Sequence, residues 1–334
     1  MKRQAWIDYI KFIAMFMVVV YHTPPRFDTA REVALFNMGA PVFFFAAGYL
    51  FNIAKQQGFF NFLRHRARQI LVPYTTFFII FYALWLLVGR RMAGPEEMAI
   101  DTATPLWQFL QGTPDVVLGP FWFLAALFSM QLIYYPIKKY LPGMWPLVVS
   151  LLLSLSLLIL PDVPWLRYWN LDKAFLYMPI YAVGNCCKPL IDSFNFNSTA
   201  RTLLWLLLAA VGLAFLVVAP LTIDRGVAYV LAPEAVILAL PLYAAVCKWI
   251  EAHHGVSRVA WNVAITSITY LALQNYLIGI IKMLVKKVAG PEILDESILL
   301  KIGVAVLVMV ALYPLALIVD RYLPFLLGKS KSRQ

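Results

Sequence analysis

Apolar residues follow one another in long runs along most of the chain. The hydrocarbon core of a bilayer is about 30 Å thick, and a helix needs about 20 mostly apolar residues to cross it. Ten runs reach or approach this length: 6–22, 33–53, 70–88, 121–137, 144–160, 174–187, 202–219, 229–247, 263–281 and 302–319. The pattern predicts an all-α integral membrane protein, a polytopic bundle of about ten transmembrane helices.

The overall composition supports this fold class. Hydrophobic residues make up 62% of the chain and charged residues 13%, whereas soluble domains are roughly half apolar and a quarter charged. The longest predicted connection, 89–120, leaves no room for an additional soluble domain. We therefore expect a single transmembrane domain over residues 1–334.

The distribution of positive charge predicts the orientation. Lys and Arg are more frequent in those connections that are cytoplasmic if the chain starts inside, so we expect both termini in the cytoplasm. Basic loops beside anionic lipid account for the net charge of +11 without a nucleic-acid partner. Asp8 and Lys11 within the first run argue against a cleaved signal peptide. The three cysteines lie in apolar sequence and imply no disulfide framework.

The first run is unusual because it carries ionisable residues. Lys11 and His22 are eleven residues apart, which is about three helical turns or 16 Å, so they share one face of a helix. Asp8, Met15 and Val18 complete this stripe. Ionisable groups within a bilayer are costly and usually face a cavity. In the alternative interpretation, Lys11 snorkels or pairs with Asp8, and His22 is an interfacial residue.

Two broad function classes remain open at this point. No Walker-type GK[ST] loop and no HExxH zinc motif is present, which argues against an ATP-driven pump or a metalloprotease and predicts no metal site. A secondary transporter or glycan exporter is the alternative to an enzyme, because internal charges could line a translocation path. No inverted repeat is visible, and the charges lie on one stripe.

The Lys11–His22 pair of the first predicted helix is followed along the chain by four further motifs: "FNMGAPVFFFAAGYLF", "FLRHRARQILVPY", "FWFLAALF" and "LYMPIYAVGN". The pair matches the R/K-x10-H signature on the first helix of the acyltransferase-3 family of membrane-bound O-acyltransferases. The four motifs resemble, in order, the patterns of the second, third, fourth and sixth helices of this family. One stretch departs from the family: "SITYLALQNY" has Gln274 and Asn275 near the place where many members carry a histidine.

The resemblance implies acetyl transfer from cytoplasmic acetyl-CoA, a co-substrate, to a hydroxyl of a bacterial surface or lipid-linked glycan at the bacterial inner membrane. A sugar hydroxyl needs a base to remove its proton, and imidazole is suited to this at neutral pH. His22 is the candidate catalytic residue, acting directly or through an acetylated intermediate. His65, His253 and His254 lie in predicted cytoplasmic loops and are expected to be solvated.

The candidate donor-binding residues are basic residues near the predicted cytoplasmic face, together with the tyrosine that ends the third-helix motif. They are Lys11, Arg64, Arg66, Arg68 and Tyr74. Arginines suit the phosphates of a nucleotide, although basic residues at a cytoplasmic helix end are also what topology alone requires.

The candidate acceptor-binding or channel residues are polar or aromatic residues close to His22 in sequence or within the apolar runs. They are Arg26, Asp28, Asn37, Tyr49, Trp122, Glu234, Gln274 and Asn275. Because the donor is cytoplasmic and His22 is predicted at the outer end, we expect a narrow passage with its cytoplasmic mouth near Lys11 and Arg66 and its outer end at His22.

Overall fold

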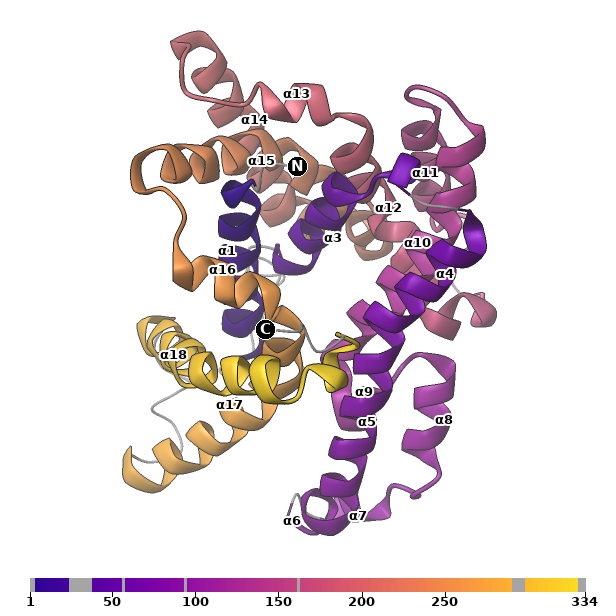
Figure 1. The fold of residues 1–334 in the computed structure, drawn as a ribbon, viewed down its shortest axis with the longest axis vertical. Helices are drawn as coiled ribbons and strands as arrows, with labels where there is room; N and C mark the ends of the chain where they lie inside the picture. Colours follow the sequence, from indigo (N-terminus) through magenta and orange to yellow (C-terminus); the bar gives the residue numbers. More distant parts are fainter. Residues whose placement is uncertain are drawn as a thin grey trace. The chain divides into compact units, whose positions relative to one another are not determined.

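The computed structural model describes residues 4–23, 38–55, 58–92, 95–160, 163–289 and 298–329. Every regular element within these ranges is helical, and they contain no strand (Figure 1). Seven helical segments are long and apolar enough to cross a membrane. The all-helical, multi-pass character predicted from the hydrophobic runs is confirmed in the described part of the chain.

The seven segments coincide with seven of the predicted runs. They are α1 (Ala5–His22), Phe59–Gly89, Asp115–Tyr140, α14 (Thr199–Thr222), α15 (Arg225–His254), Ser267–Val285 within α17 (Ser267–Ala289), and α18 (Ile298–Tyr322). Phe59–Gly89 joins α4 (Phe59–Arg66), η2 (Ala67–Leu71), α5 (Val72–Leu84) and η3 (Trp85–Gly89). Asp115–Tyr140 joins α9 (Asp115–Leu118), η4 (Gly119–Phe121) and α10 (Trp122–Tyr140).

The other three predicted runs correspond to shorter helices, α3 (Gly39–Leu50), α11 (Trp145–Ser156) and α12 (Leu171–Cys186). Part of the run 33–53 lies outside the described residues. The count of ten spans and the cytoplasmic location of both termini remain predictions.

The remaining elements are short: η1 (Ile53–Lys55), α6 (Arg90–Met92), α7 (Pro95–Ala99), α8 (Thr104–Gln111), η5 (Pro164–Asn170), α13 (Lys188–Asp192), α16 (Arg258–Ile265) and η6 (Pro324–Leu327).

The ninth predicted run, 263–281, starts before the corresponding helix, α17, does in the structure. The run 263–281 is interrupted at Thr266, between α16 and α17. The Thr266 hydroxyl donates a hydrogen bond to the Asn262 carbonyl oxygen at 2.7 Å, a side-chain contact of the kind that competes with regular helix geometry. The apolar pattern continues across this break, so hydropathy alone could not reveal it.

The chain divides into two compact units. Unit 1 comprises Met1–Phe51, Gly143–Pro161 and Leu176–Leu317, and unit 2 comprises Asn52–Pro142, Asp162–Phe175 and Ile318–Gln334. The expectation of a single domain over 1–334 remains a prediction.

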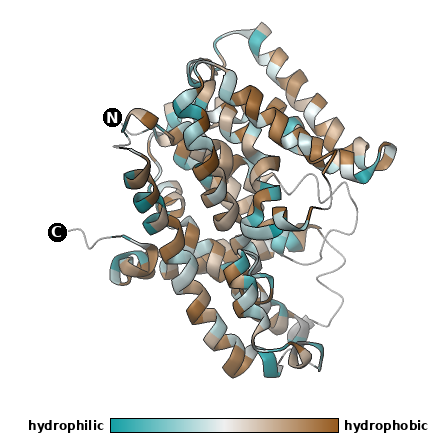
Figure 2. Cartoon of the chain, turned by 90° about the vertical axis from the view of Figure 1, so that its right-hand side faces the viewer, coloured by the Kyte–Doolittle hydropathy of each residue, from teal (hydrophilic) through white to brown (hydrophobic). Residues whose placement is uncertain are grey.

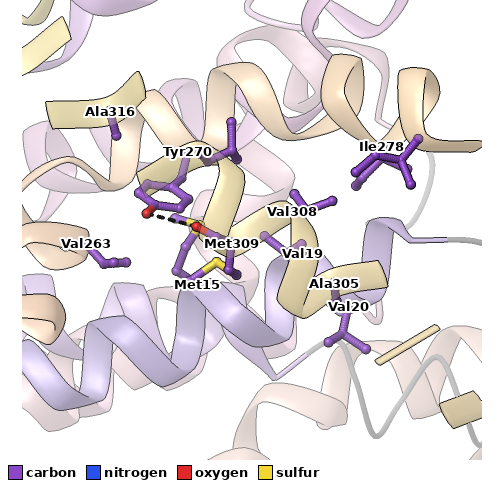
Figure 3. Packing of buried hydrophobic residues seen from close by; sticks show 12 residues of the cluster. Met15, Val19, Val20, Val263, Tyr270, Ile278, Ala305, Val308, Met309 and Ala316 are labelled. Carbon is purple, nitrogen blue, oxygen red and sulfur yellow. Dashed lines mark hydrogen bonds between the residues drawn. The ribbon is translucent and has the colours of Figure 1, made fainter. Parts of the chain in front are cut away.

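One part of the core of unit 1 lies where α1 meets α16, α17 and α18 (Figure 3). Met15 and Val19 of α1 are buried there together with residues of the other three helices, and the Tyr270 hydroxyl donates to the Met309 carbonyl oxygen at 3.3 Å. The helices are largely hydrophobic along their length (Figure 2). Some of these hydrophobic residues are exposed, as on α14, where Leu203 and Leu207 are 61% and 60% exposed. Such surfaces suit a hydrocarbon environment.

Helices α3 and α12 approach each other closely through two glycines of unit 1. A Cβ atom on Gly48 would lie 2.0 Å from the Tyr181 carbonyl oxygen, and one on Gly184 would lie 2.4 Å from the Phe45 carbonyl oxygen. Small residues at a crossing let helix backbones approach within a membrane, where packing replaces the hydrophobic effect.

The glycine crossing yields a stability prediction. Gly184→Ala places a methyl group against backbone, which cannot move as a side chain can, so we expect it to destabilise the protein by about 1–3 kcal/mol. Gly279→Ala is the matched control, because its Cβ atom meets nothing within 4 Å. Thermal unfolding in detergent should show a lower Tm for Gly184→Ala alone. Equal Tm values for the two variants would contradict the crossing.

Candidate functional site

The start of α1 is held by a carboxylate from a distant part of the sequence. The backbone N–H groups of Ala5 and Trp6 donate to the two carboxylate oxygens of Glu251, each at 3.1 Å, and Glu251 lies 246 residues after Ala5. The first N–H groups of a helix lack partners within the helix, and a negative charge is favourable beside them. The preceding residue, Gln4, provides no side-chain cap. Glu251 therefore takes the place of a local N-cap.

Further contacts attach α15 and the chain just beyond it to the first turns of α1. The Tyr9 hydroxyl donates to the Gly255 carbonyl oxygen at 2.9 Å, and the Tyr243 hydroxyl donates to the Ile10 carbonyl oxygen at 3.1 Å. The Lys248 ammonium lies 4.9 Å from the centre of the Trp6 ring, within cation–π range. Together with the Glu251 cap, these contacts fix the axial position and the rotation of α1.

Tyr49 lies at this same end of α1. Its ring meets Trp6 edge-on at 5.0 Å, and its hydroxyl donates to Asp192 at 2.5 Å. Tyr49 was predicted among the acceptor or channel residues, but the structure places it beside the N-terminal end of α1, whereas His22 ends the helix. The side chain is buried, and the Lys188 ammonium also lies 5.3 Å from its ring centre.

The polar stripe of α1 is carried by one uninterrupted helix. Because α1 is regular from Ala5 to His22, Lys11 and His22 lie on the same face about three turns apart. Both side chains are half-buried. The Asp8 carboxylate is close enough to act electrostatically on the Lys11 ammonium. The predicted geometry of the stripe is confirmed, and the roles of its residues remain predictions.

The imidazole of His22 is oriented by its own helix. Its Nδ1 atom lies 2.8 Å from the Val18 carbonyl oxygen. A carbonyl oxygen can only accept, so Nδ1 carries the hydrogen, and in the neutral ring Nε2 is the atom that can take a proton. Tyr21 packs edge-on to the ring at 5.2 Å. This contact favours the tautomer in which Nδ1 carries the hydrogen.

Three of the predicted acceptor residues, Arg26, Asp28 and Asn37, lie outside the described residues. Their roles remain predictions.

Only one of the two carboxylate oxygens of Glu234 has a hydrogen-bond partner in the described part of the chain. The Ser154 hydroxyl lies 3.1 Å from Oε1 of Glu234, and it also lies 3.4 Å from the Leu176 carbonyl oxygen. The other carboxylate oxygen, Oε2, is buried and has no hydrogen-bond partner in the described part of the chain. Buried polar atoms are nearly always paired in folded proteins, so Oε2 is an acceptor that a ligand or water could use.

The pair Gln274 and Asn275 splits between two faces of α17. Gln274 is fully buried, and neither its amide oxygen nor its amide nitrogen has a hydrogen-bond partner among the described residues. Asn275 is exposed. An unpaired buried amide costs free energy, and it therefore calls for an explanation. Only Gln274 points into the protein.

The basic segment of unit 2 contains three arginines in different situations. Arg64 is exposed. Arg66 donates through Nη1 to Gln69 at 2.9 Å, and its guanidinium lies 5.5 Å from the Phe62 ring centre. Arg68 donates through Nε to the Gly328 carbonyl oxygen at 2.9 Å. Arg68 thus holds the turn that follows η6, a structural role that sequence reasoning missed.

Tyr74 and Trp122 also belong to unit 2 and make packing contacts there. The Tyr74 hydroxyl donates to the Phe109 carbonyl oxygen at 2.9 Å, and the Tyr74 and Phe109 rings stack at 5.1 Å. The Lys173 ammonium lies 4.8 Å from the Trp122 ring centre. The suggested roles of Tyr74 in donor binding and of Trp122 in the channel remain predictions beside these contacts, as does a passage from Arg66 to His22.

Comparison with known proteins supplies the family. The model of the Acyl_transf_3 family, described as an acyltransferase domain, matches residues 4–321. The chain belongs to this family, as the order of its motifs indicated. No curated protein and no solved structure matches the chain.

The long-range cap yields a prediction about α1. Glu251→Ala leaves the first N–H groups of α1 without partners, so we expect a loss of about 0.5–2 kcal/mol in stability and faster hydrogen exchange at residues 5–10. Asp224→Ala is the matched control, because Asp224 caps α15 locally through Gly226 and Val227.

Both variants should lose similar stability, but only Glu251→Ala should loosen the first turns of α1. Unchanged exchange at residues 5–10 in Glu251→Ala would show that this carboxylate does not hold the helix.

Proposed function

We propose that this member of the acyltransferase family transfers an acetyl group from acetyl-CoA to a hydroxyl of a bacterial surface or lipid-linked glycan at the inner membrane, with His22 as the base. Family membership supports acyl transfer, and seven long apolar helices support a membrane location. The observation that carries the proposal is the orientation of His22, whose Nδ1–H donates to the Val18 carbonyl oxygen.

The chemistry follows from this tautomer. Nε2 takes the proton of the sugar hydroxyl as its oxygen attacks the carbonyl carbon of the thioester. The carbon–sulfur bond then breaks, and the imidazolium returns the proton to the CoA thiolate. The products are the O-acetyl sugar and free CoA, and His22 regains its starting state. If Nε2 itself attacks the thioester first, the carbon–sulfur bond breaks, CoA leaves as the thiolate and an acetyl-histidine forms. The sugar oxygen then attacks this acetyl group, its proton passes to the CoA thiolate, and the nitrogen–carbon bond breaks to restore the imidazole.

On the donor side, we propose that the phosphates of acetyl-CoA meet arginines of the basic segment. Arg64 is exposed and suited to a phosphate contact. Arg68 is the weakest of the three candidates, because its Nε already bonds the Gly328 carbonyl oxygen. Lys11, six residues after the capped start of α1, would attract the anionic part of the donor from the stripe that leads to His22.

On the acceptor side, we propose Gln274 and Glu234 as hydrogen-bonding partners of sugar hydroxyls. The Gln274 amide offers both a donor and an acceptor that no described residue satisfies, and Oε2 of Glu234 offers an acceptor. A hydroxyl both donates and accepts, so it can pair with either group. Arg26, Asp28 and Asn37 remain candidates from their proximity to His22 in the sequence.

The proposal predicts the effect of removing the imidazole. Loss of a general base typically slows a reaction by about 10²–10⁴-fold, so His22→Ala should lose O-acetylation to that extent. His253→Ala is the matched control, since His253 is exposed and its Nδ1 also contacts a carbonyl oxygen four residues earlier.

The assay uses purified protein in nanodiscs with radiolabelled acetyl-CoA, and mass spectrometry of surface glycans from cells with and without the gene identifies the acceptor. A folded His22→Ala variant with a normal rate of acetyl transfer would show that His22 takes no part in the reaction. A wild-type protein that neither binds acetyl-CoA nor releases CoA would favour a transporter.

A further inference from the structure

Unit 1 contains a cavity of about 470 Å³ between α1, α16, α17 and α18. Its volume lies in the range of small-molecule sites. Phe12 and Phe16 form the wall contributed by α1, and Lys11 and His22 are not part of the lining. Phe12 is rotated by about 100° from Lys11 around the helix axis and by about 80° from His22. The wall that α1 contributes to the cavity therefore lies about a quarter turn from these two residues.

The lining changes from buried to exposed across the cavity. Its floor consists of Val263, Tyr270 and Met309, which belong to the buried core shown in Figure 3. Its rim consists of exposed valines: Val259 (50%), Val306 (46%) and Val310 (64%). The cavity thus opens at exposed apolar residues of α16 and α18, and α18 is long and apolar enough to cross a membrane.

The polar atoms of the lining already have partners within the protein. The Tyr270 hydroxyl donates to the Met309 carbonyl oxygen at 3.3 Å, and the Tyr313 hydroxyl accepts from the Asn262 amide at 2.6 Å. A sugar or nucleotide placed here would find few hydrogen-bonding groups to replace its bonds to water, because all other lining side chains are apolar. A hydrocarbon chain has no such cost, and the aromatic and aliphatic walls suit it.

The depth of the cavity and a nearby positive charge indicate which kind of hydrocarbon chain it can hold. Phe16 is eleven residues from the start of α1, about 16 Å along the axis or roughly half the hydrocarbon thickness. That is the depth of one lipid leaflet. At the level where α16 begins, the exposed Arg258 directly precedes the rim residue Val259. The Tyr9–Gly255 hydrogen bond places this part of the chain beside the first turns of α1.

From this arrangement we infer that the cavity holds one acyl tail of an anionic phospholipid from the leaflet in which α1 begins. The tail lies against Phe12 and Phe16, and the head group pairs with Arg258. The inference is independent of the acyl donor and of the role of His22.

The test uses the full protein in phosphatidylcholine nanodiscs with a phosphatidylglycerol probe that carries a photoreactive diazirine in the middle of one tail. After illumination, peptide mass spectrometry should find adducts concentrated on residues 259–263 and 306–310. Val310→Trp, which fills the mouth without entering the core, should lower this labelling about tenfold, equivalent to about 1.4 kcal/mol. Leu315→Trp is the matched control, because Leu315 is exposed on α18 (45%), lies outside the segments expected to be labelled and does not line the cavity.

Head-group preference is tested by competition. Unlabelled phosphatidylglycerol should displace the probe better than phosphatidylcholine does, and Arg258→Gln should abolish this preference. Arg201→Gln, a change at an exposed arginine in the first turn of α14, should leave it intact.

Three results would overturn the inference. Even labelling of the exposed face of α18 that Val310→Trp leaves unchanged would mean ordinary contact with bulk lipid. Equal displacement of the probe by the two phospholipids would show that the site does not select an anionic head group. Displacement by a polyprenyl phosphate but not by phosphatidylglycerol would assign the cavity to a longer lipid carrier.

Discussion

The contact between the Glu251 carboxylate and the first two N–H groups of α1 sets the position of the helix that carries the candidate chemistry. A helix in an apolar medium can slide or rotate at little cost in burial, because lipid is as apolar as its neighbours. A charged cap, a cation–π contact at Trp6 and two tyrosine hydrogen bonds remove that freedom at one end. Since α1 is regular to His22, fixing its start also fixes the place of the imidazole within unit 1.

The side chains around α1 have different surroundings. Met15 and Val19 are buried in the core with residues of α16, α17 and α18. Phe12 and Phe16 also pack against this core, and they border an apolar cavity. Lys11 and His22 lie on the face of the helix that also carries Met15, so the polar residues of α1 are close neighbours of the core around the helix axis.

The sequence predicted those features that depend on local pattern. Hydrophobic runs located the helices, since the length of an apolar run is set by the bilayer, and the spacing of Lys11 and His22 placed both on one face because helical periodicity is regular. It did not predict the Glu251 cap, because a residue near the end of a long apolar helix carries no local mark of a partner 246 residues away. Nor could it separate Arg68, bound to the Gly328 carbonyl oxygen, from Arg64, because three alternating arginines look alike until the fold supplies their neighbours.

The proposed chemistry depends most directly on which nitrogen of His22 carries the hydrogen. Nitrogen NMR of protein labelled with ¹⁵N at its four histidines, with His22 assigned through His22→Gln, measures this at neutral pH. If Nε2 acts as the base, the spectrum should show a neutral ring with the hydrogen on Nδ1 and an unprotonated Nε2. A neutral ring with the hydrogen on Nε2 would contradict this role, because the atom proposed to receive the proton would already be protonated.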